Sequence, residues 1–240
     1  MSKRKLFVIA DTETVTDARI LLDIAWIVCD IKGNELERFN AIPKELIQFP
    51  FGKKIISSDR FTCRRTQDGI RKSDWYINNI NNGEINIMSL KDIRSLYHSI
   101  GERYNGTPIF CAYNADFDVQ VLNSNSNIYG YGNFFKPNDK IFDIWHAALC
   151  TICDSETFAL WAWTNKMLSE SGNIRTNAET IYRYMKKDID FEERHTALAD
   201  CEIEKEILFK ARKSHKKIVS TKVMPVWKCE EWLRLQARIQ

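Results

Sequence analysis

An apolar run near the start of the chain ends abruptly in two carboxylates. Residues 6–10 read Leu-Phe-Val-Ile-Ala, and Asp11 and Glu13 follow with one residue between them. The run is too short to cross a membrane and is rich in strand formers, so it predicts a strand buried on both faces. Residues i and i+2 of a strand point the same way, so Asp11 and Glu13 would share one face, with side-chain origins about 6–7 Å apart.

These two acids need compensation if the strand is buried. Neighbouring anions repel each other and lose hydration unless a cation, a helix N-terminus or water compensates them. One divalent metal ion would compensate the charge of both acids. The alternative is a strand that simply ends here with solvated acids, and the Asp-x-Glu pair alone does not exclude it. The partners of the pair must therefore come from elsewhere in the chain.

Length and composition predict one main domain. The chain has 240 residues, of which 44% are hydrophobic, enough for a substantial core. We expect a domain over residues 1–210, followed by a basic linker and a short C-terminal helix over 211–240 that packs on the same domain. No run approaches the length of a membrane span, and the first apolar run meets acid too early for a secretory signal. We therefore expect a soluble, cytoplasmic protein without membrane contact.

The seven cysteines are odd in number and scattered, which is not typical of a disulfide framework. Cys150 and Cys153 form the one close pair, which leaves a zinc or redox role open. No second pair and no suitably spaced histidine accompanies them. Reduced, mostly buried thiols are the simpler interpretation.

Positive charge is concentrated in two segments of the chain. The whole chain carries a formal charge of +3. Residues 51–72 hold seven Lys or Arg against two Asp, and residues 210–222 hold six Lys or Arg and no acid. Such segments suit a polyanion such as nucleic acid. Solvated faces or flexible tails are the alternative.

The order of the expected elements predicts an α/β fold. Apolar runs at 6–10, 20–29 and 36–42, with turn residues at 32–34, indicate an antiparallel three-strand meander. A capping box at Ser89 predicts a helix to about Tyr104, and the strand expected at 107–113 would add in parallel. Further elements follow in order: a helix through 119–123, a strand from 140, and helices over 155–170, from 176 and over 196–211.

Three later residues are candidate partners for the acid pair. In the last expected helix, Asp200 shares a stripe with apolar residues, so its carboxylate would be buried and would need a cation or a donor. His195 lies at the start of that helix, where the dipole favours a neutral imidazole. Asp118 follows a buried strand. Four carboxylates and one histidine at one end of a sheet predict Mg²⁺ or Mn²⁺, with two ions as the general solution for phosphodiester chemistry.

The chain resembles the DEDDh 3′-to-5′ exonucleases of the RNase H-like fold. The resemblance rests on Asp11-Thr-Glu13, then the segment 114–118 (Asn-Ala-Asp-Phe-Asp), then the segment 195–200 (His-Thr-Ala-Leu-Ala-Asp). It covers residues 5–210, and the segment 176–184 is similar to the RNase T and phage exodeoxyribonuclease branch. The resemblance implies a mixed sheet flanked by helices. The chain departs from the family at Val15, where glycine is often found.

The resemblance also implies roles for the five matching residues. Asp11, Glu13 and Asp200 would bind the catalytic metal ion, and Asp11 would reach the second ion, which Asp118 would hold partly through water. His195 would act as the general base that takes a proton from the attacking water. Thr12 and Thr14 lie where family members contact the terminal nucleotide. Asn114 is a further candidate for substrate contact, and the aromatic side chains of Tyr113, Phe117, Phe61 and Trp75 are candidates for stacking on the terminal bases.

These inferences predict a stand-alone, metal-dependent exonuclease that releases nucleoside monophosphates from the 3′ end of single-stranded DNA or RNA. A proofreading subunit of a polymerase is the alternative within catalysis; Trp232, Leu235 and Ile239 would lie on one face of a C-terminal helix and offer a docking surface. A homodimer also stays open. A catalytically inactive nucleic-acid-binding module would have lost an acid or the histidine, and this chain keeps all five. The sequence does not decide between DNA and RNA.

Overall fold

The computed structural model describes residues 4–15, 19–48, 72–214, 216 and 218. Contacts within the chain divide it into two compact units. The first, here called the sheet unit, contains residues 1–142 and 194–202. The second, here called the helical unit, contains residues 143–193 and 203–240. Helix α10 (Ala197–Lys213) begins in the sheet unit and continues in the helical unit.

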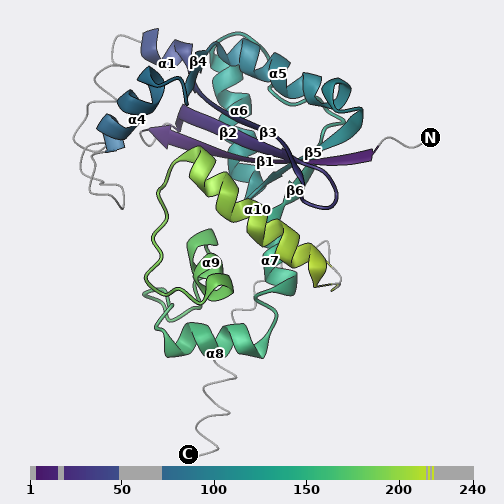
Figure 1. The fold of residues 1–240 in the computed structure, drawn as a ribbon. Helices are drawn as coiled ribbons and strands as arrows, with labels where there is room; N and C mark the ends of the chain where they lie inside the picture. The colour runs from purple at the N-terminus through teal and green to yellow at the C-terminus, as the bar shows by residue number, and fades with distance from the viewer. Residues whose placement is uncertain (1–3, 16–18, 49–71, 215, 217, 219–240) are drawn as a thin grey trace, which may run out of the picture. The chain divides into compact units, whose positions relative to one another are not determined.

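One mixed sheet organises the sheet unit (Figure 1). It has six strands in the order β4-β3-β2-β1-β5-β6. The first three strands form the expected antiparallel meander, and β5 pairs with β1 in parallel. The strands are β1 (Arg4–Val15), β2 (Ile20–Cys29), β3 (Glu35–Pro43), β4 (Asn86–Met88), β5 (Gly106–Ala112) and β6 (Lys140–Asp143).

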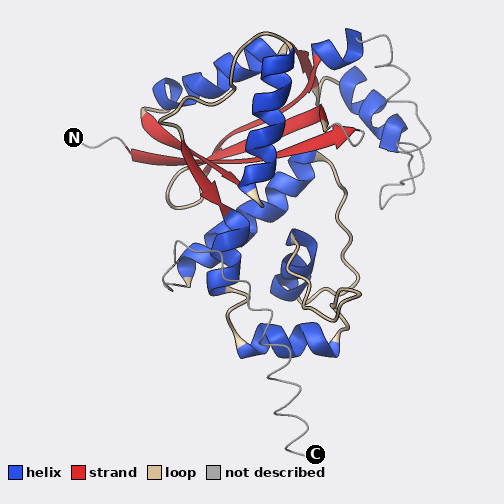
Figure 2. Cartoon of the chain, turned by 180° about the vertical axis from the view of Figure 1, so that it is seen from behind, coloured by secondary structure: helices blue, strands red, loops and turns tan. Residues whose placement is uncertain are grey.

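Strand β1 separates the core of the sheet unit from the acid pair. Leu6, Val8 and Ala10 belong to one buried cluster with residues of α5 (Leu90–Arg103) and α6 (Ala115–Ile128). The two views show α6 against one face of the sheet and the start of α10 against the other (Figures 1 and 2). Because side chains alternate along a strand, Asp11 and Glu13 point away from this core.

Local sequence signals explain most of the helix boundaries in the sheet unit. Ser89 caps α5, since its hydroxyl accepts a hydrogen bond from the Asp92 N–H, as the capping box predicts. Helix α6 begins at Ala115, earlier than the expected segment 119–123. Two short helices, α1 (Lys44–Gln48) and α4 (Lys72–Asn81), flank the segment 49–71, and strand β4 was not predicted.

The helical unit contains α7 (Ile144–Thr151), α8 (Glu156–Thr164), α9 (Ala178–Lys186) and the C-terminal part of α10. The prediction of a helix over 155–170 was too long, because α8 ends at Thr164. Asn177 takes the N-cap position of α9, while the Thr176 hydroxyl accepts a hydrogen bond from Trp145 Nε1. The helix expected from residue 176 therefore begins at Ala178, with Asn177 at its N-cap.

Two groups of contacts tie the helices of this unit together. Tyr184 of α9 packs edge-on against Phe158 and Trp161 of α8, with ring centroids 5.1 and 5.4 Å apart. From α9, Tyr182 donates a hydrogen bond to Glu206, and Lys186 Nζ lies 2.6 Å from the same carboxylate. Trp161 therefore serves packing here.

Several predictions concern the ends of the chain and its cysteines. Most of the expected C-terminal tail, including Trp232, Leu235 and Ile239, lies outside the described residues. Among the helices of the described part, none combines the length and the apolar character that a membrane crossing requires. The five cysteines in the described part, which include Cys150 and Cys153, form no disulfide.

Candidate metal centre

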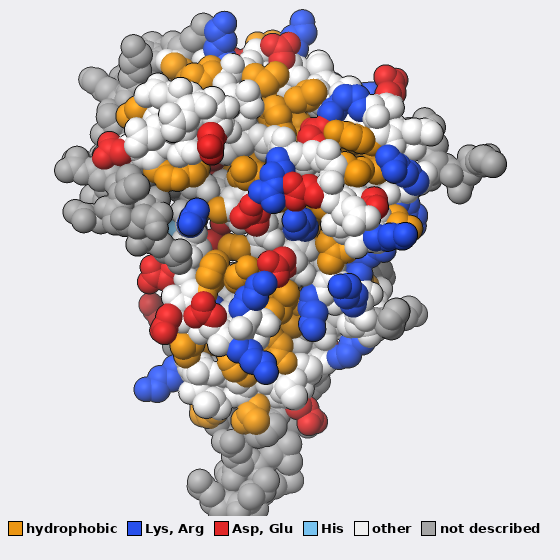
Figure 3. Space-filling view, in the orientation of Figure 1, with side chains coloured by type: hydrophobic (Ala, Val, Ile, Leu, Met, Phe, Trp, Pro, Cys, Tyr) orange, Lys and Arg blue, Asp and Glu red, His pale blue; other side chains and the backbone are white. Residues whose placement is uncertain are grey.

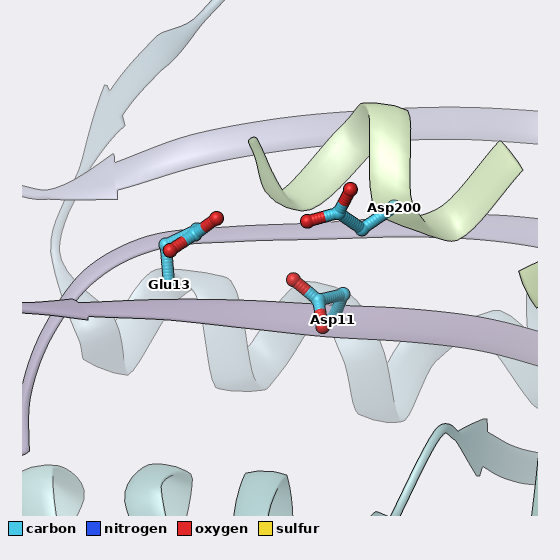
Figure 4. Close-up of side chains that lie close together, drawn as sticks. All are labelled: Asp11, Glu13 and Asp200. Atoms are coloured by element: carbon cyan, nitrogen blue, oxygen red, sulfur yellow. The ribbon is translucent and has the colours of Figure 1, made fainter. Parts of the chain in front are cut away.

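Three carboxylates converge at the start of α10 (Figure 4). Asp11 and Glu13 extend from β1, and Asp200 extends toward them from the first turn of α10. One oxygen from each carboxylate lies within 4.8 Å of the others. Asp11 and Glu13 are half-buried, and Asp200 is only 8% exposed. The sheet unit thus brings together three of the acids that the sequence selected.

The pleat of β1 and a contact between α10 and β2 position the three acids. The pleat of β1 sends Asp11 and Glu13 to one face, and a bulge or irregularity in the pairing with β2 follows directly after Glu13. Such bulges are common beside active sites because they re-aim side chains. On the helix, the Cys201 thiol lies 3.5 Å from the Ala25 carbonyl of β2, which places Asp200 over the sheet.

The three residues fit a divalent metal ion. Hard oxygen donors are what Mg²⁺ and Mn²⁺ prefer, and this group supplies oxygen alone. Three negative charges at this separation repel one another unless a cation joins them or a proton binds. Asp200 sits in the first turn of α10, where the helix dipole compensates part of its charge.

Asp118 lies next to this group but makes a different contact. It is 2% exposed, and its Oδ1 accepts hydrogen bonds from the Thr12 N–H at 3.0 Å and the Thr12 hydroxyl at 2.7 Å. It is not one of the three carboxylates within 4.8 Å of one another. Asp118 therefore anchors the residue between Asp11 and Glu13, and its predicted contact with a second ion stays a prediction.

His195 precedes α10 and is exposed. Its φ is 54°, in the left-handed region, which is uncommon for a residue with a side chain. Strained backbone of this kind is often found at functional sites. The position at the start of the last helix agrees with the expected one, and the role as general base stays a prediction.

The candidate substrate contacts surround the end of β1 and the start of α6. Thr12 is buried and Thr14 is half-buried. Tyr113 is half-buried, and exposed Asn114 precedes α6 with a left-handed φ of 61°. Phe117 is half-buried, and the Arg19 guanidinium lies 5.0 Å from its ring centroid, with a hydrogen bond from Arg19 to Gln120.

Two further predictions concern Trp75 and Phe61, as stacking candidates, and the departure from the resembled family at Val15. Trp75 lies on α4 and lines a cavity of about 220 Å³ with Asn40 and Thr196, while Phe61 lies outside the described residues. Val15 ends β1 as a buried residue, so the strand continues through the position where the sequence departs from the family that it resembles.

A fourth acid, Asp23, was missed by the sequence interpretation. It lies on β2 opposite Glu13, is fully buried, and accepts a 2.7 Å hydrogen bond from the Tyr76 hydroxyl. Burial raises the pKa of Tyr76 well above its ordinary value, and the nearby Asp23, Glu13 and Asp200 carboxylates raise it further. Tyr76 therefore stays protonated and donates a hydrogen bond to Asp23. The available signal was an acid inside the apolar run 20–29.

The basic segments are only partly described. Residues 51–71 lie outside the described part of the chain. The second basic segment begins in the last turn of α10 with Lys210, Arg212 and Lys213. Lys and Arg side chains gather around the C-terminal half of this helix on the face drawn in Figure 3.

Comparison with known proteins gives a likeness of fold. No family model matches the chain, and no curated protein matches its sequence. Exonuclease I from Methylocaldum szegediense is similar over 89% of this chain and 41% of its own length, with a TM-score of 0.52 and 15% identity. E. coli exonuclease I in complex with a dA16 oligonucleotide is similar over 88% and 41%, with a TM-score of 0.50 and 15% identity.

The chain thus spans about two fifths of the length of these exonucleases. At this level of identity the likeness concerns the fold. It confirms the predicted fold class: a mixed sheet of antiparallel and parallel strands flanked by helices, the fold of these exonuclease I structures.

Proposed function

We propose that this protein is a metal-dependent 3′-to-5′ exonuclease that hydrolyses phosphodiester bonds at the 3′ ends of DNA or RNA. The observation that carries the proposal is the convergence of Asp11, Glu13 and Asp200 within 4.8 Å. Solvated acids at the end of a strand would not require a partner from the opposite end of the sequence. The exonuclease fold and the order of the three motifs support the same conclusion.

In this proposal, Asp11, Glu13 and Asp200 hold the divalent ion. Bound Mg²⁺ or Mn²⁺ supplies charge stabilisation for the phosphodiester and lowers the pKa of water. Asp118 keeps Thr12, and with it the end of β1, in place through its two hydrogen bonds. His195, exposed at the start of α10, accepts the proton of the attacking water. Tyr113, Asn114 and Phe117 contact the terminal nucleotides.

A second ion, held by Asp11 and Asp118, belongs to the proposal as well. The half-buried Asp11 side chain and the contact between Asp118 and Thr12 put both acids at the same end of β1. A pair of divalent ions would supply charge stabilisation for phosphodiester hydrolysis. Mn²⁺ titration of the wild type and Asp118→Asn tests this: two sites should become one.

The test of function uses purified protein and substrates labelled at the 5′ end: single-stranded DNA, duplex DNA and RNA, each with Mg²⁺, Mn²⁺ or chelator. We expect ladders that shorten from the 3′ end, release of nucleoside monophosphates, and loss of both in Asp11→Ala. Immediate release of the labelled 5′ nucleotide would show the opposite polarity. Ladders that persist in Asp11→Ala would refute the assigned centre.

A further inference from the structure

We propose that Tyr76 is a positioning residue for the carboxylate centre. Through its hydrogen bond to Asp23, it fixes the start of α10 against the sheet and thereby sets Asp200 opposite Asp11 and Glu13. The inference rests on the proposed function of that centre as a metal site. It assigns a role to a tyrosine from α4, an element outside the three sequence motifs.

The contacts of Asp23 connect three elements. Asp23 lies on β2 in register with Glu13 and is fully buried. Its Oδ2 accepts a hydrogen bond from the Tyr76 hydroxyl at 2.7 Å, and the Ala197 N–H lies 3.4 Å from the same oxygen. Ala197 is the first residue of α10. One carboxylate oxygen thus joins α4 and β2 to the start of the helix that carries Asp200.

The complete burial of Asp23 makes its hydrogen bonds important. A buried carboxyl group needs hydrogen-bond partners, because the loss of one leaves a desolvation penalty. Asp23 also neighbours the acidic centre, as its pairing with Glu13 shows. The N-terminus of α10 offers partial positive charge, but the Ala197 bond is long, so the Tyr76 hydroxyl is the shorter of these two contacts.

The ring of Tyr76 is held independently of its hydroxyl. It is fully buried in a cluster with Val15, Leu22 and Ile42, and it packs edge-on against Trp75 with centroids 5.1 Å apart. A phenylalanine would occupy the same space. Tyr76→Phe therefore removes the hydrogen bond to Asp23 and keeps the packing of the ring in the core.

Loss of the Tyr76 hydroxyl should change the position of the metal ligand Asp200. Asp200 lies one helical turn after Ala197, so a change in the start of α10 is carried directly to its carboxylate. Metal–ligand distances in well-formed sites lie within about 0.2 Å of their usual values. Loss of residues that orient ligands typically lowers metal affinity about 10–100-fold. We expect a loss in this range for Tyr76→Phe.

Tyr131 provides a matched control within the sheet unit. Its hydroxyl donates to Glu45 at 3.0 Å, so Tyr131→Phe also removes a bond between a phenol and a carboxylate. Mn²⁺ binding is measured by electron paramagnetic resonance for wild type and both variants, and unfolding in urea is measured alongside. We expect the Kd for Mn²⁺ to rise about 10–100-fold in Tyr76→Phe and to stay unchanged in Tyr131→Phe.

Asp23→Asn changes the same hydrogen bond at the acid and keeps the inference testable if Tyr76→Phe proves unstable. Asp23→Asn retains the shape of the side chain, and we expect it to weaken Mn²⁺ binding, with no further loss when Tyr76→Phe is added. Wild-type affinity in Tyr76→Phe, or equal losses in Tyr131→Phe, would overturn the inference. Wild-type Mn²⁺ affinity in Asp23→Asn, or losses of affinity that add in the double variant, would also overturn it. A wild type that binds no Mn²⁺ would refute the metal centre itself, which separates the two failures.

Discussion

Replacement of Glu13 by glutamine should make the metal-free protein more stable and the metal-loaded protein less stable. Glu13 is half-buried and belongs to the group of three carboxylates within 4.8 Å. Without an ion, like charges at this separation oppose folding. With an ion, the same charges become ligands. The opposite signs distinguish a metal centre from an acidic cluster that only serves the fold.

The separation of the acids sets the magnitude. Two unit charges 4.8 Å apart repel by about 3.5 kcal/mol at an effective dielectric constant of about 20. Solvent at the half-exposed side and partial protonation reduce this, so we expect a gain of about 1–2 kcal/mol for metal-free Glu13→Gln. Wild type should gain about 2.7 kcal/mol when the ion is present at a hundredfold excess over its Kd. Glu13→Gln should gain much less.

The assay is thermal unfolding of both proteins in chelator and in increasing Mn²⁺. At this chain length, each kcal/mol corresponds to a shift of about 2–4 °C in Tm. Glu13→Gln should melt above wild type in chelator and below it at saturating Mn²⁺. Glu170→Gln, at an exposed acid, should follow wild type in both conditions. A lower Tm for Glu13→Gln in chelator, or equal stabilisation by Mn²⁺, would refute the reasoning.

Three further predictions concern the stability of the sheet unit. Thr12→Val removes a donor to the buried Asp118 and should lower the free energy of unfolding by about 1.5–3 kcal/mol, whereas Thr12→Ser should restore most of it; urea unfolding decides. Gly106→Ala should cost about 1–3 kcal/mol in the same measurement, because a Cβ there would lie 2.6 Å from the Leu6 side chain; wild-type stability would contradict this. Burial lowers the pKa of His98, so the folded state binds a proton less tightly than the unfolded chain, and stability should fall as pH drops below about 6.5. His98→Gln should lose that part of the pH dependence, and an unchanged slope between pH 7 and pH 5 would contradict it.

Elements with local signals could be predicted from the sequence. Ser89 and Asp92 lie three residues apart, and their contact forms wherever that helix forms, so the start of α5 was predicted. The strands of the meander show continuous apolar runs that a buried sheet requires. Strand β4 was missed because its three residues, Asn86–Met88, are too few to form a pattern and are partly exposed.

The candidate site could be predicted where its residues follow the periodicity of a helix or a strand. Asp200 falls on the buried stripe of its helix by spacing, and Asp11 and Glu13 share one face of β1. The environment of Asp118 depends on a contact with Thr12, a residue more than a hundred positions away in the chain. No local pattern encodes that distance, so its hydrogen bonds could not be predicted.

The role of Asp23 could not be predicted from the sequence for the same reason. Within the apolar run 20–29 it reads as an ordinary interruption of a strand. Its role follows from the Tyr76 hydroxyl and the start of α10, which the fold brings to it from two distant segments. Acids in buried runs therefore warrant examination as supports for a site, even when they match no motif.

The most direct test of the central claim compares hydrolysis with metal binding in the same preparation. The rate at which 5′-labelled single-stranded DNA is shortened from its 3′ end is measured against Mn²⁺ concentration, beside binding measured by electron paramagnetic resonance. We predict that activity and occupancy rise together and that both are lost in Asp11→Asn. Hydrolysis at full rate in chelator, or in an Asp11→Asn variant that binds no Mn²⁺, would contradict the account.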